Sequence, residues 1–520
     1  MEIASNYASA NRLAAASIPF FYTTLAGGPN RNTGEYVVGR KYRGLFDEND
    51  GAYVSLATTP RGEIIIDRDC YGAIPLFYST TRPIVSTDLR LFNNLNDLEF
   101  DCQAVAEYLS TAYLTGGKTI YRNVRAAMPD EIIILDGKTA RTSQKSIFPE
   151  QKLTNSEEIS ALLEQALDHS IADLLERCPE DLLLNLSGGT DSTLILAKFR
   201  EMDRQRKIIT NTYFHCDWRD DINDWEYAKE ASSVLGSDHQ LVEIDNQTFC
   251  QGHEELVTRA KYVFHTYAAA FYVQNKAVNS PSNAPIVNGS GPDESIIGTE
   301  KIPIHDLLPL RNLKKAQWVD HLINNIDYIK IPESVVVGML RNGTGGFVQS
   351  RRRIASTLLD APNFLEFQRR YHAVTILQDH IQELTAVAQV LGRSILFPYL
   401  TNDIFRIIFS ARFEDLNVAG IYKAVLKRVL ETRMPKEFVY RRKIGFQSPS
   451  RPYFMSNLGL GAAMAAFLRD GHSELLNMVV VDPAIRQRLR GHLDLHRRYD
   501  FLEWTVYNIL LLENARGKHA

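Results

Sequence analysis

The stretch that most constrains this chain is an apolar run that breaks into a glycine turn and then resumes. Residues 182–186 read LLLNL, residues 187–192 read SGGTDS, and apolar side chains recur at helical spacing over 194–197. The pattern predicts a buried strand, a tight turn and a helix. Adjacent glycines let the backbone bend closely around a ligand, and the N–H groups of the turn and helix start can converge on an anion. The sequence therefore predicts a phosphate site, and Asp191 implies a Mg²⁺ ion between its carboxylate and the phosphate oxygens.

The string SGGTDS resembles the pyrophosphatase-loop signature SGGxDS of the ATP pyrophosphatases. Those enzymes cut ATP between the α- and β-phosphates and leave an adenylated substrate and free pyrophosphate. The Walker pattern does not apply, because no GK[ST] follows the glycines. The resemblance implies that ATP and pyrophosphate are held by one continuous set of residues, namely Leu186, Ser187, Gly188, Gly189, Thr190, Asp191 and Ser192.

Composition and charge exclude several other classes. The 520 residues are 45% hydrophobic and 23% charged, which is typical of a soluble globular protein. A net charge of −4 argues against a general affinity for nucleic acid, and no apolar run approaches the ~20 residues of a membrane span. The five cysteines lie far apart without a CxxC pair, as expected of reduced thiols. We therefore expect a cytoplasmic protein with no nucleic-acid or membrane partner.

Residues 1–145 carry short strand-like runs between turn residues, with a helix expected at 105–114. Residues 68–78, RDCYGAIPLFY, resemble the RDxxGxxPLYY turn in the N-terminal domain of glutamine-dependent asparagine synthetases, and residues 104–131 fit a helix and closing turn of the same domain. The resemblance implies an αββα sandwich of the N-terminal-nucleophile type. We expect residues 1–145 to form this glutaminase-like domain and the polar residues 139–155 to form a linker.

This domain is expected to lack its usual nucleophile. A working glutaminase of this type has a cysteine at position 2, whose own α-amine serves as the base. Position 2 is Glu2 here, and the first cysteine is Cys70, for which we expect a packing role in the RDxxG turn. We therefore expect no ammonia from glutamine and interpret the domain as a scaffold that shapes the cleft of the following domain.

From residue 156 onward, helical and strand-like patterns alternate. Besides the strand at 182–186, helices are expected at 156–173 and 224–235, and strands at 208–214 and 241–244. Such alternation implies a doubly wound parallel sheet, whose ligands lie at the carboxyl ends of the strands. We expect residues 156–520 to form this ATP-binding ligase domain, and an overall α/β fold.

Two further stretches of this part have plain structural interpretations. Arg351, Arg352 and Arg353 match no motif, and a run of like charges predicts a solvated loop. Residues 493–512 carry apolar side chains on one helical face, which core packing explains.

A second glycine turn lies at residues 285–298, PIVNGSGPDESIIG, again after an apolar run. It resembles the GxGxDE turn that closes over ATP in the asparagine synthetases, and the resemblance implies nucleotide contact by Gly289. The aspartate of the turn, Asp293, is implied as a second Mg²⁺ ligand. Two carboxylates from two strand ends, Asp191 and Asp293, suit an ion carried on a triphosphate, and we expect both to be catalytic.

The usual base of the family is missing from both of its positions. Ser290 stands between the glycines, where relatives carry Glu or Tyr, and serine is a poor base at neutral pH. Residues 394–403 read SILFPYLTND, so Ser394 and Leu396 replace the Glu and Arg of the family's ExRxPFLD turn. Acidic and imidazole candidates remain on the preceding helix, namely Asp379, His380 and Glu383.

The third motif spans residues 423–450, KAVLKRVLETRMPKEFVYRRKIGFQSPS, and resembles the family pattern KxxLR…LPxxxxxRxKxGFxxP. The resemblance implies that Lys423 contacts the polyphosphate. It also implies that Lys443 reaches the reacting carbonyl and the α-phosphate, where a fixed ammonium stabilises the transition state more than the ground state.

Together the resemblances imply an ATP-dependent, AMP-forming ligase of the asparagine synthetase superfamily that uses ATP and Mg²⁺. Because Glu2, Ser290 and Ser394 depart from the family, we favour an intramolecular amine, as in lasso-peptide cyclases (macrolactam synthetases). There the N-terminal amine of a precursor peptide attacks its own adenylated Asp or Glu side chain, and proximity replaces much of the missing base. The expected partners are the precursor peptide and a leader peptidase or leader-binding protein of the same pathway.

Three alternatives remain open at this point. The first is a β-lactam synthetase, a relative that also uses an intramolecular amine, and the second is an ammonia-dependent enzyme of the asparagine synthetase type. The third is a nucleotide-binding scaffold of a biosynthetic complex, against which the intact Asp191, Asp293 and Lys443 argue.

Overall fold

The computed structural model describes most of the chain, with short gaps and one long one. The described residues are 22–24, 36–46, 49–94, 98–178, 181–216, 224–298, 302–327, 329, 331–339, 345–441 and 500–517. Among the helices of these residues, none combines the length and the hydropathy needed to cross a membrane.

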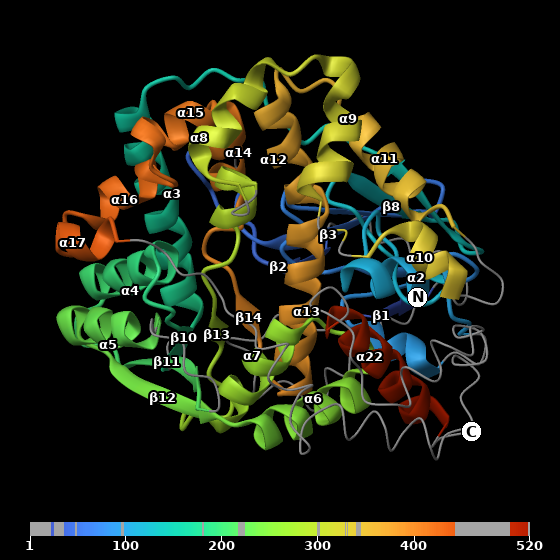
Figure 1. Cartoon of the computed structure of the whole chain (residues 1–520). Helices are drawn as coiled ribbons and strands as arrows, with labels where there is room; N and C mark the ends of the chain where they lie inside the picture. The colour runs from blue at the N-terminus through green and yellow to red at the C-terminus, as the bar shows by residue number, and fades with distance from the viewer. Residues whose placement is uncertain are drawn as a thin grey trace.

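Two antiparallel sheets form the N-terminal region, residues 22–144 (Figure 1). The first sheet has the order β1-β6-β5-β7 and consists of β1 (Tyr22–Thr24), β6 (Ile84–Ser86), β5 (Phe77–Ser79) and β7 (Val124–Ala126). The second has the order β2-β3-β4-β8-β9 and consists of β2 (Tyr36–Gly39), β3 (Tyr53–Thr58), β4 (Ile64–Arg68), β8 (Glu131–Leu135) and β9 (Ala140–Gln144).

Side-chain alternation along the first sheet explains how this region packs. Tyr78 and Val85 point into the apolar core shared with the second sheet, and their neighbours Phe77 and Ile84 join the large core on the opposite face. Successive residues of a strand face opposite sides of a sheet. The first sheet is therefore buried on both faces, between the second sheet and a helical layer.

Helix α2 (Cys102–Thr111) belongs to that helical layer and starts three residues earlier than expected. Asp101 caps it by accepting the N–H groups of Gln103 and Ala104, which is why the helix begins at Cys102 and not at Val105. It ends where Ala112 adopts a left-handed φ of +59°. The two antiparallel sheets and this helix, together with the parallel sheet of the later residues, confirm the expected α/β fold class.

The expected linker at 139–155 is wrong in its first part. Residues 140–144 form β9, which pairs antiparallel with β8 at the edge of the second sheet. The side chains of β9 are largely exposed. Because this edge strand carries mostly polar residues, its composition resembles that of a linker. The strand is specified by its pairing with β8 rather than by an apolar pattern.

A five-stranded parallel sheet organises the C-terminal domain, from residue 156 onward (Figure 1). Its order is β12-β11-β10-β13-β14, and its strands are β10 (Leu182–Asn185), β11 (Ile208–His215), β12 (Asp238–Ile244), β13 (Ile286–Val287) and β14 (Ile395–Leu396). The chain runs outward from β10 to β12 on one side and returns to β13 on the other side. The topological switch point therefore lies between β10 and β13, where such sheets bind ligands at the carboxyl ends of the strands.

Helices cover both faces of this sheet. Figure 1 shows α3, α4 and α5 on one side and α6, α7 and α13 on the other. The longer helices are α3 (Ser156–Arg177), α4 (Thr190–Met202), α5 (Asp224–Leu235), α6 (Asn246–Ala260), α7 (Thr266–Ala277), α11 (Phe347–Thr357), α12 (Phe364–Val374), α13 (Ile376–Val390), α14 (Asn402–Ser410) and α22 (Asp500–Gly517). Short helices include α8 (Ile304–Leu307), α9 (Trp318–His321), α10 (Glu333–Met339), α15 (Phe413–Leu416), α16 (Ala424–Leu430), α17 (Lys436–Val439) and the π-helix η2 (Asp293–Ile297).

The C-terminal helix α22 packs against α6, as its apolar residues predict. Trp504 is fully buried, and its ring lies 4.1 Å from that of His253 on α6. The expected start at residue 493 lies outside the described residues, and the helix continues past 512 to Gly517.

The expectation of a solvated loop at Arg351–Arg353 is wrong. All three residues lie on α11, where successive side chains point about 100° apart, so one of three consecutive arginines faces inward. Arg351 is 0% exposed, Arg352 is half-buried and Arg353 is exposed. The helix buries the first of the three arginines, and a buried guanidinium needs carboxylates of opposite charge beside it.

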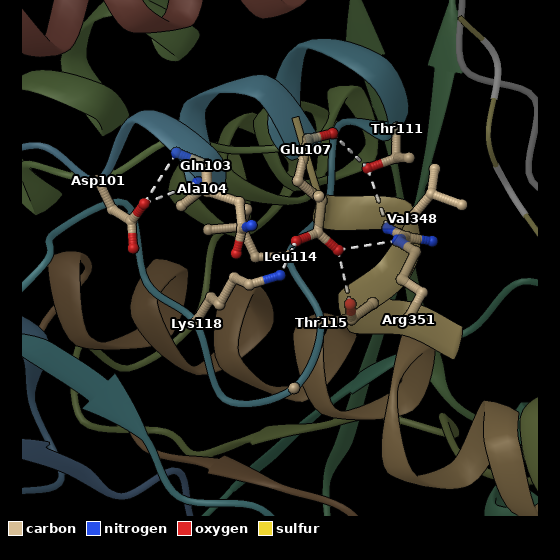
Figure 2. A network of polar contacts seen from close by, with 12 residues as sticks. Asp101, Gln103, Ala104, Glu107, Thr111, Leu114, Thr115, Lys118, Val348 and Arg351 are labelled. Atoms are coloured by element: carbon tan, nitrogen blue, oxygen red, sulfur yellow. Dashed lines mark hydrogen bonds and ion pairs between the residues drawn. The ribbon is translucent and has the colours of Figure 1, made fainter. Parts of the chain in front are cut away.

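Those opposite charges come from both parts of the chain. Arg351 Nε contacts Glu107 Oε1 of α2 at 2.8 Å, and Arg351 Nη1 contacts Asp327 at 2.8 Å. Figure 2 shows the Glu107 carboxylate in contact with Arg351, Lys118 and Thr115. Lys118 Nζ and Thr115 Oγ1 each lie 2.6 Å from it. Two cations thus balance two buried carboxylates, and every charge has hydrogen-bond partners, as a buried ionic cluster requires.

Candidate active site

The turn after β10 has the shape that its glycines predict. It lies between β10 and α4, which confirms the expected strand, turn and helix. Gly188 adopts φ +71°, and a Cβ there would lie 2.6 Å from the backbone of Tyr227, so only glycine fits without displacement. The hydroxyls of Ser187 and Ser192 lie 3.1 Å apart, and Ser192 Oγ also accepts the N–H of Ser187.

The start of α4 offers a site for an anion. The first N–H groups of a helix have no acceptor within it, and the helix dipole adds partial positive charge. Gly189 occupies the N-cap and has no side chain to occupy those groups, while Thr190 and Asp191 open the helix. Leu186, buried beneath the turn, donates its N–H to Asn211 O at 2.9 Å and anchors it to β11. The residues expected to bind pyrophosphate therefore run without a break from the end of β10, through the turn, into the first residues of α4.

The second glycine turn lies against the first. A Cβ at Gly289 would come within 3.2 Å of Ser192 N, so this glycine allows the two turns to touch. Gly291 adopts φ +121°, which a side chain rarely allows, and it leads into η2, whose first residue is Asp293. Because β10 and β13 are parallel neighbours, Asp191 and Asp293 emerge at the same end of the sheet.

Lys423 joins the two aspartates. Its Nζ lies 2.5 Å from Asp191 Oδ2 and also contacts Asp293 Oδ1, while the side chain is about 5% exposed. The residue adopts a left-handed φ of +54° immediately before α16, and its N–H is held by Asn417 Oδ1 at 2.8 Å. Tyr399 donates its hydroxyl to the carbonyl of Asp191 at 3.0 Å. The structure thus brings together three of the residues that the motifs singled out.

The two aspartates fit a Mg²⁺ ion that is carried on a triphosphate. Their oxygens converge on one ammonium, so they are close enough to share one cation. Among the described residues, no group of three or more His, Cys, Asp and Glu is arranged to hold a metal. Mg²⁺ typically takes one or two carboxylates and completes its shell with phosphate oxygens and water, so this pair suits that role.

Arg441 is a site residue that the sequence reasoning missed. Its Nη2 donates to Gly188 O at 2.7 Å, and its guanidinium lies 3.5 Å from the centre of the Tyr227 ring. It therefore fixes the segment before Lys443 to the turn after β10. Lys443 itself lies outside the described residues. The sequence signal was the pair of arginines directly before Lys443. The first of the pair, Arg441, packs on Tyr227, and this contact is seen only in the fold.

Comparison with known families decides the class. Residues 162–514 match the family model described as asparagine synthase. The chain belongs to the asparagine synthase family. No curated protein matches it.

Membership of the asparagine synthase family makes the chain an ATP-dependent ligase that forms carbon–nitrogen bonds. The matched residues include both glycine turns, Lys423 and α13. The switch point between β10 and β13 is where the fold itself places a ligand. The geometry and the family therefore point to the same end of the parallel sheet.

The two positions where the family carries its base have structural roles here. Ser290 donates both its N–H, at 2.9 Å, and its hydroxyl, at 2.6 Å, to Asn288 Oδ1 within the same turn. The carbonyl of Ser394 accepts the N–H of Ile286 at 2.9 Å, and Leu396 lies buried in β14. Neither position supplies a base.

Two of the three candidates on α13 are buried carboxyl groups. Asp379 accepts the N–H of Leu114 at 3.1 Å, and burial raises the pKa of Asp379 to about 7. Glu383 accepts the N–H of His265 at 2.8 Å, and burial together with the nearby Asp379 raises the pKa of Glu383 well above its usual range. Burial therefore favours the protonated, uncharged form of both groups.

The third candidate, His380, is different because it remains partly exposed and has an ionic partner. Its Nδ1 lies 3.1 Å from Glu294 Oε1, and the imidazole side chain is 29% exposed. Burial alone would raise the pKa of Glu294, but the hydrogen bond and charge of His380 outweigh burial and lower that pKa. The Tyr267 ring packs edge-on against the imidazole at 4.5 Å.

Cys70 has the packing role that the sequence predicts. Its N–H donates to Asn402 Oδ1 of α14 at 2.7 Å, and burial raises the pKa of the Cys70 thiol to about 11. A thiol of this kind is protonated at neutral pH and is a poor nucleophile.

Proposed function

We propose that the chain is an AMP-forming macrolactam synthetase of the lasso-peptide cyclase type. It adenylates an Asp or Glu side chain of a precursor peptide, and the N-terminal amine of the same peptide then displaces AMP. The observation that carries the proposal is the convergence of Asp191, Asp293 and Lys423 beside the pyrophosphate turn. This arrangement supports activation by ATP, and the departures at the base positions favour an amine from within the substrate.

In the first half-reaction the substrate carboxylate attacks the α-phosphate of ATP and pyrophosphate leaves. The N–H groups at the start of α4, with Ser187 and Ser192, would hold the leaving phosphates. Asp191 and Asp293 would hold Mg²⁺, which neutralises charge on the phosphates. Lys423, which contacts both carboxylates, would stabilise the negative charge that builds on the polyphosphate as pyrophosphate leaves.

In the second half-reaction the amine attacks the acyl carbon and AMP leaves. Lys443 would stabilise the charge that builds on the carbonyl and α-phosphate oxygens. The contact of Arg441 with Gly188 O supports this role, because it fixes the chain two residues before Lys443 to the turn that binds pyrophosphate.

The departures at the two base positions support an amine that comes from the substrate itself. Ser290 is hydrogen-bonded to Asn288, the Ser394 carbonyl is bonded within the parallel sheet, and the Cys70 thiol is buried, so these positions favour an amine that the substrate itself supplies. A prefolded peptide that brings its own amine needs neither ammonia nor a channel, and proximity contributes strongly to the rate. The further partners of such an enzyme are a leader peptidase or a leader-binding protein, in the cytoplasm.

The test is incubation of the chain with ATP, Mg²⁺ and synthetic peptides that have a free N-terminal amine and one internal Asp or Glu. Loss of one water from the peptide mass, with AMP and pyrophosphate as the other products, supports the proposal. Asp191→Asn is the control and should abolish the mass loss. A β-lactam product, or asparagine formed from free ammonia, contradicts it. Failure to turn over ATP with any peptide favours a nucleotide-binding scaffold.

A further inference from the structure

His380 and Glu294 form a hydrogen-bonded pair beside Asp293. The proposed function above assigns neither residue a role. Glu294 directly follows Asp293 in η2, while His380 comes from the middle of α13, 86 residues later in the chain. Their contact at 3.1 Å therefore links the turn that closes over ATP to the helix that precedes β14.

The geometry assigns the two imidazole nitrogens different states. Nδ1 faces a carboxylate oxygen, which can only accept, so Nδ1 carries a proton and Nε2 is the nitrogen that can exchange one. No described residue hydrogen-bonds to Nε2 of His380. An imidazole with one nitrogen fixed by a carboxylate and the other available to exchange a proton is the arrangement of a general base.

The surroundings of His380 favour it over its neighbours. Asp379 and Glu383 flank it on α13, but both are under 10% exposed and bonded to backbone N–H groups. Tyr267 of α7 faces the imidazole edge-on, and Glu294 of η2 faces Nδ1. Of the three candidates on α13, His380 alone combines solvent access with an orienting partner.

We propose that His380, oriented by Glu294, is the general base that takes the proton from the attacking amine during amide formation. The inference rests on the proposed function and adds a catalytic residue to it. The nitrogen lone pair forms the new C–N bond, and the bond from the acyl carbon to the adenylate oxygen breaks with its electron pair leaving on AMP. The proton lost from nitrogen passes to Nε2 and then to solvent, to which the His380 side chain is 29% exposed.

The amine of a peptide needs such a base. An α-amino group has a pKa of about 7.7–8.0, so much of it is protonated at neutral pH, and the nitrogen must lose a further proton after attack. Hydroxylamine is neutral at the same pH and strongly nucleophilic. It traps an acyl adenylate as a hydroxamate with little help from a base, and this difference separates the role of His380 from adenylation.

The experiment measures three quantities on the full chain with ATP, Mg²⁺ and one synthetic peptide. They are exchange of labelled pyrophosphate into ATP, hydroxamate formed in the presence of hydroxylamine, and macrolactam formed in its absence. For His380→Gln we expect macrolactam formation to fall by about 100-fold or more, while exchange and hydroxamate formation stay within about threefold of the wild type. Added imidazole should restore part of the macrolactam rate to His380→Gly.

Glu294 is a positioning residue and needs a different readout. We expect Glu294→Gln to lower kcat for the macrolactam by about 10-fold, with KM for the peptide and hydroxamate formation nearly unchanged, and Glu294→Asp to recover part of the loss. His305→Gln, an exposed histidine of α8, is the matched control and should behave as the wild type.

The outcomes separate the inference from the proposed function. Full macrolactam formation by His380→Gln overturns the inference and leaves the proposed function intact. An equal loss of exchange, hydroxamate and macrolactam in His380→Gln also overturns it, because the residue would then act in binding or folding. A wild-type chain that forms neither hydroxamate nor macrolactam contradicts the proposed function, and with it the role of His380.

Discussion

Glu107 and Arg351 lie 244 residues apart in the chain and form an ion pair in which neither side chain is exposed. The pair joins α2 of the N-terminal region to α11 of the C-terminal domain (Figure 2). Asp327 lies on the other side of the guanidinium. Burial favours the neutral acid there, but the charge of Arg351 and the hydrogen bond from Tyr113 outweigh it and lower the pKa of Asp327.

Replacing Arg351 by Met should destabilise the whole chain. The change leaves two carboxylates buried without their shared cation, which typically costs about 3–5 kcal/mol. The free energy of unfolding in urea measures the loss. Arg353→Met, on the exposed side of the same helix, should change it by no more than about 0.5 kcal/mol. Equal stabilities for the two variants would show that the buried pair contributes nothing.

Lys423→Met should affect the first half-reaction. Without the ammonium, Asp191 and Asp293 repel each other and the polyphosphate loses a cation. We expect pyrophosphate exchange to fall by about 100-fold or more. Lys436→Met, an exposed lysine of α17, serves as control. Unchanged exchange in Lys423→Met would place the polyphosphate elsewhere.

Arg441→Lys tests the anchor of the Lys443 segment. Lysine keeps the charge but loses the planar group that lies on Tyr227 while it donates to Gly188 O. The rate of amide formation should drop by roughly 10-fold, because a small displacement of a catalytic group has effects of this order or larger. The unfolding free energy should change little. A rate equal to that of the wild type would mean that the contact does not position Lys443.

His253 gives the chain an acid-sensitive core. Its ring is buried against Trp504, and burial lowers the pKa of His253 to about 3, against about 6.5 in an unfolded chain. Below pH ~6.5 the unfolded state therefore binds a proton on His253, whereas the folded state binds it only near pH ~3. Because the unfolded state binds more protons in this range, this group lowers the free energy of unfolding as the pH falls from ~6.5 towards ~3. Between pH 7 and pH 5 the loss amounts to about 2 kcal/mol.

His253→Phe should remove that loss. Other groups also titrate over the same range, so the informative quantity is the change in unfolding free energy from pH 7 to pH 5 in the variant minus the same change in the wild type. Phenylalanine keeps a ring against Trp504 and has no proton to bind. Equal pH dependence in the two proteins would mean that His253 accepts its proton while folded.

The parts of this fold that follow local patterns could be predicted from the sequence. The turn at 187–192 and the aspartates of both glycine turns lie where their motifs place them, because strand ends and glycines are specified locally. Arg351 and β9 could not be predicted in the same way. The first is buried by charges distant in the chain, and the second is defined by its pairing with β8. The role of Lys443 stays a prediction.

The contacts of Lys423, Arg441 and His380 could also not be predicted from the sequence. Each side chain meets a partner from a distant segment: Asp191, Gly188 and Glu294 respectively. A motif can indicate that a lysine matters, but it does not show which carboxylates surround it. His380 was one of three candidates on a helix until its exposure and its carboxylate partner separated it from the others.

The hydrogen bond from the Leu114 N–H to Asp379 has an evolutionary consequence. Through it, and through the Tyr108 hydroxyl on Phe264 O at 2.7 Å, the N-terminal region completes the surroundings of the helix that carries His380. A mutation that deleted this region would expose buried acids beside the reacting groups. Natural selection on this helix would therefore preserve the N-terminal region for its contacts alone, independently of any chemistry that the region itself performs.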